Sequence, residues 1–326
     1  MTHADERRAT DAGYPPQQGE FDLIRRMRER WGPLAADIGD DASVLRVPRG
    51  EQMVVSTDTA LELVHFRRDW LSLREIGYRA VTAALSDLAA MAAAPQGVLI
   101  ALELSPEARD GLMELADGIG DAVRAVGTVV LGGNLSRATV LGITTTAVGA
   151  AFAPLKRSGA RPGDLVYVTG QLGGPSAALK ALDVGHPLAA PLRDRLARPV
   201  ARVAEARWLA TRGAVAAIDI SDGLASDAAH LAAASDVALE VAVERVPVFQ
   251  GAGEPDALAG GEEYELLIVA RGALPEAEFV ERFSLPLTPI GRVVDAATGG
   301  GGHHGVSFTR AGKRVAAPVG YDHFSR

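Results

Sequence analysis

Residues 74–104 read REIGYRAVTAALSDLAAMAAAPQGVLIALEL, and this stretch decides the fold class. Its first part, residues 74–94, is an alanine-rich apolar run with helical periodicity that stops before Pro95, which predicts a long helix. Residues 97–104, GVLIALEL, form a short and almost continuous apolar run, which is typical of a buried strand. A long apolar helix followed at once by a buried strand indicates a chain that mixes both kinds of element.

The same mixture continues on both sides of this stretch. In the first half we expect helices over 21–31 and 106–127 and strands over 53–58, 128–133 and 139–150, the last two bracketing the loop GGNLSRA. From Pro154 onward we expect strands at 165–170, 214–220, 237–246, 264–270 and 287–294, helices from about 174, over 201–213 and over 223–235, and a final hairpin. The chain has 326 residues, and single cores stop growing at about 250–300, so we expect two mixed lobes, α/β or α+β.

Composition excludes several classes of protein. Hydrophobic residues make up 48% and charged residues 23% of the chain, as in ordinary soluble globular proteins. The net charge of −8 argues against nucleic-acid binding, which needs a basic face. Cysteine is absent, so disulfides, a thiolate nucleophile and Cys-ligated zinc are excluded. No apolar run reaches the roughly 18–20 residues of a membrane span and no signal core is present, so we expect no membrane contact and a cytoplasmic location.

Asp87 is an acidic residue inside the apolar helix predicted over 74–94. Its helical neighbours Ala83, Ala84, Ala90 and Met91 offer no cation, and a buried carboxylate without a partner is costly. Two interpretations stay open: Ser86 or Asp87 caps a helix that starts there, or Asp87 faces a cation brought from outside the helix.

Four further acids stand at comparable places. Asp41 follows Ile38-Gly39, Asp58 ends the strand 53–58, Asp219 ends a strand, and Asp222 precedes a helix. Each alone is equally a turn residue or helix cap. If they converge, like charges about 4 Å apart repel by about 4 kcal/mol at an effective dielectric of 20. Magnesium would relieve this repulsion, and the hydroxyls of Ser56 and Thr57 would add oxygen ligands.

The phosphate signals are weaker. GGNLSR at 132–137 and KRSGARPGD at 156–164 are glycine-rich turns with nearby arginines, and each is equally explained as a tight turn. The P-loop and the protein-kinase motifs are absent. Lysine occurs at only three positions, so phosphate chemistry here would rest on arginine or on metal ions.

Eight motifs in one order resemble the thiamine-monophosphate kinase family, of the superfamily that includes aminoimidazole-ribotide synthetase and selenophosphate synthetase. They are GDDASVL, STDTALELVHF, ALSDLAAMAAAP, GGNLSR, RSGARPGD, IDISDGLASD, GGEEYELL and GYDHF, and they span residues 39–324. The resemblance implies transfer of the ATP γ-phosphoryl group onto thiamine monophosphate, with several Mg²⁺ ions. It also implies an N-terminal ATP- and metal-binding α/β domain at 20–153, a C-terminal α+β domain at 154–326, and a homodimer formed through the N-terminal sheets. Residues 1–19 are rich in charged and turn-forming residues, which by itself predicts a flexible tail.

The resemblance also assigns roles to residues. The implied metal ligands are Asp41, Ser56, Thr57, Asp58, Asp87, Asn134, Asp219 and Asp222. Gly133, Asn134, Arg157 and Ser221 would bind ATP, and His65, Glu262 and Tyr321 would contact the thiamine substrate. No residue is expected to act as a covalent nucleophile, because a phosphate monoester is mostly a dianion at pH 7 and needs charge neutralisation more than a base.

Two departures from the family pattern bear on activity. The family's GGD loop is GGN here, so Asn134 replaces an expected metal-binding aspartate, and GGEEYE replaces GGEDYE. An amide oxygen ligates Mg²⁺ without supplying charge, which predicts weaker metal binding. Two alternatives therefore stay open: another ATP-dependent synthetase of the same superfamily, or a catalytically weakened binder of nucleotide or thiamine phosphate.

Overall fold

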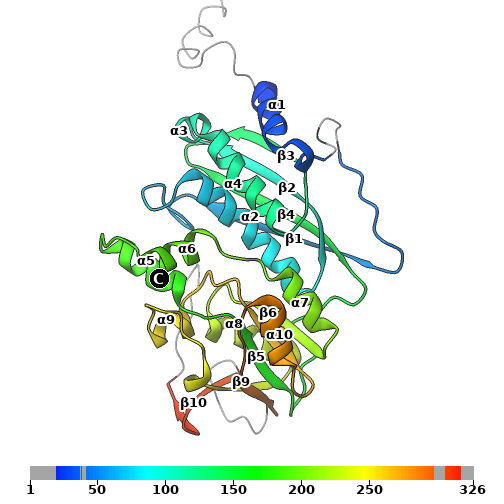
Figure 1. Ribbon diagram of the computed structural model, residues 1–326, viewed down its shortest axis with the longest axis vertical. Coiled ribbons are helices and arrows are strands. Elements are labelled where there is room, and N and C mark those ends of the chain that lie inside the picture. The colour runs from blue at the N-terminus through cyan, green and yellow to red at the C-terminus, as the bar shows by residue number, and fades with distance from the viewer. Residues whose placement is uncertain (1–19, 37, 39–41, 297–304, 317–326) are drawn as a thin grey trace, which may run out of the picture.

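Two sheets organise the chain in the computed structural model, which describes residues 20–36, 38, 42–296 and 305–316 (Figure 1). The first has four strands in the order β1-β4-β2-β3, and the second has seven in the order β11-β10-β7-β9-β5-β8-β6. Figure 1 shows the lobe built on the first sheet above the lobe built on the second. Both lobes mix helices and strands, so the predicted two-lobed α/β and α+β fold class is confirmed.

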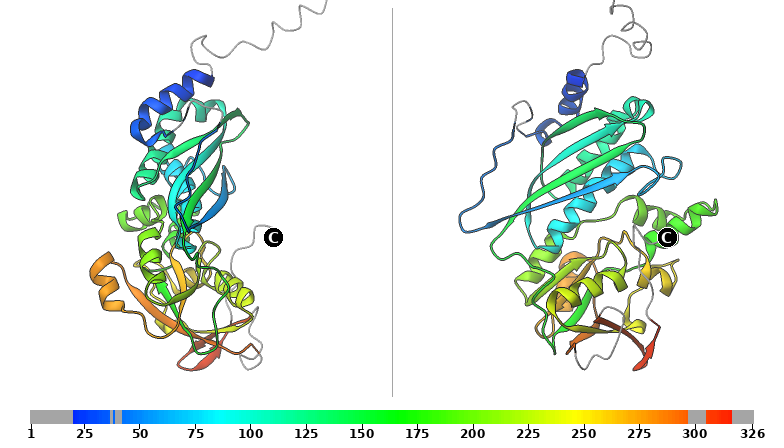
Figure 2. Two further views of the ribbon diagram at one scale, coloured as in Figure 1. Left: turned by 90° about the vertical axis from the view of Figure 1, so that its right-hand side faces the viewer. Right: turned by 180° about the vertical axis from the view of Figure 1, so that it is seen from behind.

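The N-terminal lobe packs helices on one face of its sheet (Figure 2). β4 pairs antiparallel with β1 and β2, and β2 pairs parallel with β3. Met53, Val55 and Leu99 are exposed large apolar residues of β1 and β2. The elements are α1 (Glu20–Trp31), η1 (Gly32–Leu34), β1 (Gln52–Leu61), α2 (Leu73–Ala90), β2 (Ala94–Leu104), α3 (Pro106–Asp110), α4 (Leu112–Ala125), β3 (Val130–Arg137) and β4 (Gly142–Ala151).

The C-terminal lobe has helices on both faces of its sheet. One apolar core lies around α8, and the opposite face joins a core that continues into the N-terminal lobe. The elements are β5 (Leu165–Thr169), α5 (Gly174–Asp183), α6 (Ala190–Ala197), α7 (Val203–Ala210), β6 (Ala214–Asp219), α8 (Leu224–Ser235), β7 (Ala238–Ala242), η2 (Val243–Arg245), α9 (Glu254–Ala259), β8 (Leu266–Ala270), α10 (Glu276–Phe283), β9 (Leu287–Val294), β10 (Val306–Arg310) and β11 (Lys313–Val315). None of the helices described is long and apolar enough to cross a membrane.

Helix α2 joins the two lobes. It packs on α4, β1 and β4 of its own lobe and on α6, α7 and β6 of the other. Its contact with α4 is a close approach of backbones, because a Cβ at Gly118 would lie 1.9 Å from the carbonyl oxygen of Arg74. A second close approach lies next to it, because a Cβ at Gly77 would lie 2.5 Å from the carbonyl oxygen of Leu115. These two glycine contacts fix the position of α2 against α4.

The start of α2 decides between the two interpretations of Asp87. Ser72 is the N-cap and forms a capping box with Glu75, so the helix begins at Leu73, fourteen residues before Asp87. The interpretation that Ser86 or Asp87 caps a helix starting there is wrong. Asp87 lies in the last turn of the continuous helix α2. This position agrees with the other interpretation, in which Asp87 faces a cation from outside the helix.

Three expected elements have different bounds. β1 continues to Leu61, so Asp58 lies within the strand and does not end it. The predicted loop GGNLSR is part of β3, where pairing with β2 overrides the turn tendency of its glycines. The helix predicted over 106–127 is interrupted at Gly111, since glycine weakens a helix. The domain boundary at 153–154 falls between β4 and β5 and stays a prediction.

Candidate active site

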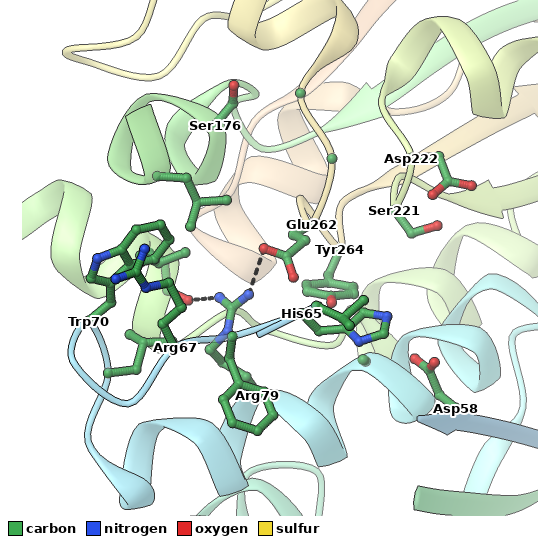
Figure 3. Close-up of a pocket in the computed structure, with 18 of the residues that line it drawn as sticks. Asp58, His65, Arg67, Trp70, Arg79, Ser176, Ser221, Asp222, Glu262 and Tyr264 are labelled. Carbon is green, nitrogen blue, oxygen red and sulfur yellow. Dashed lines mark hydrogen bonds and ion pairs between the residues drawn. The ribbon is translucent and has the colours of Figure 1, made fainter. Parts of the chain in front are cut away.

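A cavity of about 780 Å³ lies between the two lobes (Figure 3). This volume is typical of small-molecule sites. The N-terminal lobe contributes β1, the loop after it and α2, and the C-terminal lobe contributes α5, the turn after β6 and the segment before β8. The cavity therefore exists only where the two lobes meet.

One face of α2 forms the floor of the cavity. Arg79, Ala83 and Asp87 are spaced by four residues and all three line it. Residues at this spacing lie one above another on a helix, and the eight residues from Arg79 to Asp87 cover about 12 Å of helix axis. A guanidinium and a carboxylate thus stand at opposite ends of the floor, with a small side chain between them.

Carboxylates gather at the Asp87 end. Ser86 donates a hydrogen bond to Asp219 (Oγ–Oδ2, 2.7 Å), and Ser56 donates one to Asp87. Burial, together with the charge of the nearby Asp87, raises the pKa of Asp219 to about 7. Burial also raises the pKa of Asp87, and Asp58 adds to the increase. These shifts record the cost of crowding acids in a poorly solvated place.

This set of donors fits a hard divalent cation such as Mg²⁺, since all are carboxylate or hydroxyl oxygens. Within the described ranges, no three His, Asp or Glu side chains are arranged to hold a metal by themselves. Mg²⁺ is usually held by one or two carboxylates together with substrate phosphates, so a partial protein cage is consistent with it.

The turn after β6 is held by a buried acid. Asp227 of α8 accepts hydrogen bonds from the backbone N–H groups of Ser221 and Asp222, each at 3.0 Å. Gly223 follows with φ of 105°, and a Cβ there would lie 2.7 Å from the carbonyl oxygen of Ala259. The turn therefore requires glycine, and it carries Ser221 and Asp222 to the cavity.

The wall of the cavity near Asp58 carries His65 and Glu262, and a small adjoining pocket is lined by all three residues. The backbone N–H of Leu61 donates to Nδ1 of His65 at 3.1 Å, so the neutral ring carries its proton on Nε2. Glu262 and Tyr264 both have positive φ, 60° and 51°, a conformation that costs energy in non-glycine residues. Between them, Glu263 is fully buried and accepts from the backbone N–H of Gly173. The loop thus fixes the position of Glu262.

The structure brings most of the expected site residues to this cavity. Those that line it are Thr57, Asp58, His65, Asp87, Asp219, Ser221, Asp222 and Glu262. Ser56 does not line the cavity but donates a hydrogen bond to Asp87, which does. The positive charge of Arg157 partly offsets the upward pKa shifts of Asp87 and Asp219. Gly133 and Asn134 are exposed on β3 and lie outside the lining. Asp41 and Tyr321 lie outside the described residues.

Sequence reasoning missed several lining residues, among them Arg67, Trp70, Arg79, Ser176, Lys180 and Tyr264. For Arg79 a signal was available, because it stands eight residues before Asp87 with Ala83 midway, on one face of the predicted helix. For Ser176 and Lys180 no such signal exists, since their helix α5 reaches the cavity only through the packing of the C-terminal lobe.

Two family models match the chain. AIR synthase related protein, N-terminal domain, matches residues 39–151, and AIR synthase related protein, C-terminal domain, matches residues 161–303. Thiamine-monophosphate kinase of Escherichia coli (strain K12) is 34% identical, covering 94% of this chain and 98% of its own. This chain belongs to the thiamine-monophosphate kinase family. The resemblance inferred from the eight motifs is confirmed.

Solved structures of the same family share the fold. Thiamine-monophosphate kinase from Stenotrophomonas maltophilia K279a superposes with a TM-score of 0.78 at 32% identity, covering 91% of this chain and 98% of that one. AaThiL complexed with AMPPCP and TMP has a TM-score of 0.73 at 30% identity, covering 97% and 100%. The hydrogenase maturation protein HypE in complex with ATP matches at only 19% identity and a TM-score of 0.78, which shows a shared fold alone.

Ala83 offers a test of the cavity. In an Ala83→Leu variant the added atoms would occupy the floor between Arg79 and Asp87, so we expect the affinity for thiamine monophosphate to fall at least about tenfold. Isothermal titration calorimetry measures this affinity. Ala229→Leu, at a half-buried alanine of α8 outside the cavity, is the matched control and should bind as the wild type does. Equal affinities in all three proteins would contradict a binding role for this cavity.

Glu263 predicts a pH dependence of stability. Burial raises the pKa of Glu263 to about 8, above its ordinary 4.5, although Arg195 opposes the shift. The folded state therefore holds a proton that the unfolded state releases, and this contribution to stability is lost as pH rises through about 8. We expect Glu263→Gln to remove that slope in urea denaturation between about pH 5 and about pH 9. Glu281→Gln, at an exposed position of α10, should keep the wild-type slope.

Proposed function

We propose that this chain transfers the γ-phosphoryl group of ATP directly and in line onto thiamine monophosphate, giving thiamine diphosphate and ADP, with Mg²⁺ ions at the carboxylate cluster. The observation that carries the proposal is the floor of the cavity, which connects the carboxylates around Asp87 with the wall formed by His65 and Glu262. Membership of the family, and the AaThiL complex with AMPPCP and TMP, support the same reaction.

The chemistry requires little from a base. The second pKa of a phosphate monoester is about 6, so the acceptor is mostly a dianion at pH 7 and is already a nucleophile. The difficulty is to bring two polyanions together in line. Mg²⁺ held by Asp58, Asp87, Asp219 and Asp222, with oxygens from Ser56, Thr57 and Asp41, would neutralise that charge.

The remaining proposed roles concern binding and orientation. Ser221, on the turn held by Asp227, and Arg157 would contact the ATP phosphates. His65 presents its Nε2–H as a donor, and Glu262 presents an acceptor, to the thiamine moiety; Tyr321 is the third proposed contact. No side chain forms a covalent intermediate in this scheme, so the phosphoryl group passes directly from donor to acceptor.

The position of Gly133 and Asn134 in the sheet limits the ways in which a nucleotide can contact them. They lie on β3, which is separated from β1 by β4 and β2. Three strand spacings amount to about 14 Å. A nucleotide that contacts both Asp58 and Asn134 must therefore extend across the sheet.

The chain is also proposed to form a homodimer through the N-terminal sheets. Met53, Val55 and Leu99 are 51%, 57% and 37% exposed in the isolated chain. Large apolar side chains exposed on one sheet support this proposal, because protein–protein interfaces cover such surface.

Product formation tests the proposed reaction. Incubation with Mg·ATP and thiamine monophosphate should yield thiamine diphosphate and ADP in equal amounts, measured by chromatography. Production of ADP without thiamine diphosphate would favour a different ATP-dependent reaction on this fold. Binding of both ligands without turnover at any magnesium concentration would favour a catalytically weakened binder.

Asn134 tests the metal requirement. An amide oxygen supplies no charge, so Asn134→Asp should bind Mg²⁺ more tightly and reach half-maximal activity at a lower magnesium concentration. Parallel magnesium titrations of the two proteins measure this. Ser136→Asp, two residues along the same exposed strand, is the matched control for added charge. Superimposable titrations of wild type and Asn134→Asp would remove Asn134 from the metal site.

A further inference from the structure

Arg79 is a buried cation that connects the two lobes at the wall of the cavity. Its side chain is only 7% exposed, although it belongs to a residue type that is rarely buried without a partner. Its Nη2 lies 2.8 Å from Oε2 of Glu262, and its Nη1 donates to the backbone carbonyl of Leu196 at the end of α6 (Figure 3). One guanidinium from α2 therefore makes both of these contacts with the C-terminal lobe.

Glu262 is held from two directions. Its backbone has a φ of 60° and is fixed by the buried Glu263 that follows it. Its carboxylate is fixed by Arg79, yet the side chain remains 26% exposed and lines the cavity. An oxygen engaged by a planar guanidinium leaves the carboxylate with one orientation.

We propose that Arg79 is the positioning residue for Glu262, holding its carboxylate as a fixed anionic acceptor for the cationic, N–H-bearing ring system of the substrate. This inference rests on the proposed function, because thiamine monophosphate supplies that ring system. Arg79 acts through Glu262 and makes no contact with the reacting phosphate.

The geometry of α2 supports this assignment. Arg79 stands about 12 Å along the helix axis from Asp87, which lies at the carboxylate cluster. With Glu262 paired to Arg79 and Mg²⁺ held at Asp87, the two ends would present an anion and a cation, which suits a substrate with a cationic ring system at one end and a phosphate at the other. The same helix would then align both ends of the acceptor: Asp87 at the phosphate and Arg79, through Glu262, at the rings.

The test compares the KM values for the two substrates. Arg79→Met keeps the bulk of the side chain and removes the charge, so we expect the KM for thiamine monophosphate to rise by about tenfold or more while the KM for ATP stays unchanged. Arg79→Lys restores a cation beside Glu262 and should recover most of this loss. A purely structural arginine would lower the amount of folded enzyme and leave both KM values as they are.

A double-mutant cycle identifies the residue through which Arg79 acts. Glu262→Gln alone should raise the KM for thiamine monophosphate, and the double variant with Arg79→Met should be no worse, because the two changes disable one contact. Additive effects, or equal shifts in the KM values for both substrates, would overturn the proposal. Arg202→Lys is the control, since this buried arginine pairs with Glu265 away from the cavity and should change thermal stability alone.

Calorimetry separates this inference from the proposed reaction. If the wild type forms no thiamine diphosphate, the proposed reaction fails, but thiamine monophosphate binding to the wild type, Arg79→Met and Arg79→Lys still tests the positioning role. Weaker binding in Arg79→Met with recovery in Arg79→Lys would sustain the inference without turnover. Unchanged binding in all three folded proteins, verified by their melting temperatures, would overturn it.

Discussion

The crowding of buried carboxylates at one end of α2 is the constraint on which the rest of the structure depends. Asp219 is 4% exposed at the end of β6, and Asp87 approaches it from the other lobe. Burial raises the pKa of both, with repulsion from Asp87 adding to the shift at Asp219 and repulsion from Asp58 adding to the shift at Asp87. Such an arrangement costs stability by itself, and it is relieved by cations. Carboxylates that are crowded together in spite of this cost indicate a functional site.

Helix α2 packs between the two lobes and determines where the residues of the cavity floor lie. Gly77 and Gly118 let it approach α4 closely, and its opposite side meets the C-terminal lobe. One face then carries a cation, a small side chain and an anion in sequence along the cavity floor. The apolar core beside this face continues from one lobe into the other.

In the C-terminal lobe, backbone conformation positions the residues that line the cavity. Asp227 holds the turn that bears Ser221 and Asp222, and the strained segment from Glu262 to Tyr264 presents Glu262. Both features contribute to the cavity, because Ser221, Asp222, Glu262 and Tyr264 all line it.

Sequence by itself determined the two-lobed mixture of helices and strands and, through eight ordered motifs, the family. Local periodicity and short motifs depend on residues that are close together in the sequence, so they can be recognised without the folded structure. The tertiary structure alone decided that β1 passes through Asp58, that GGNLSR is a strand, and that Arg79 meets Glu262. The partners in each of these cases are far apart in the sequence, and strand pairing or a buried ion pair forms only when packing brings them together.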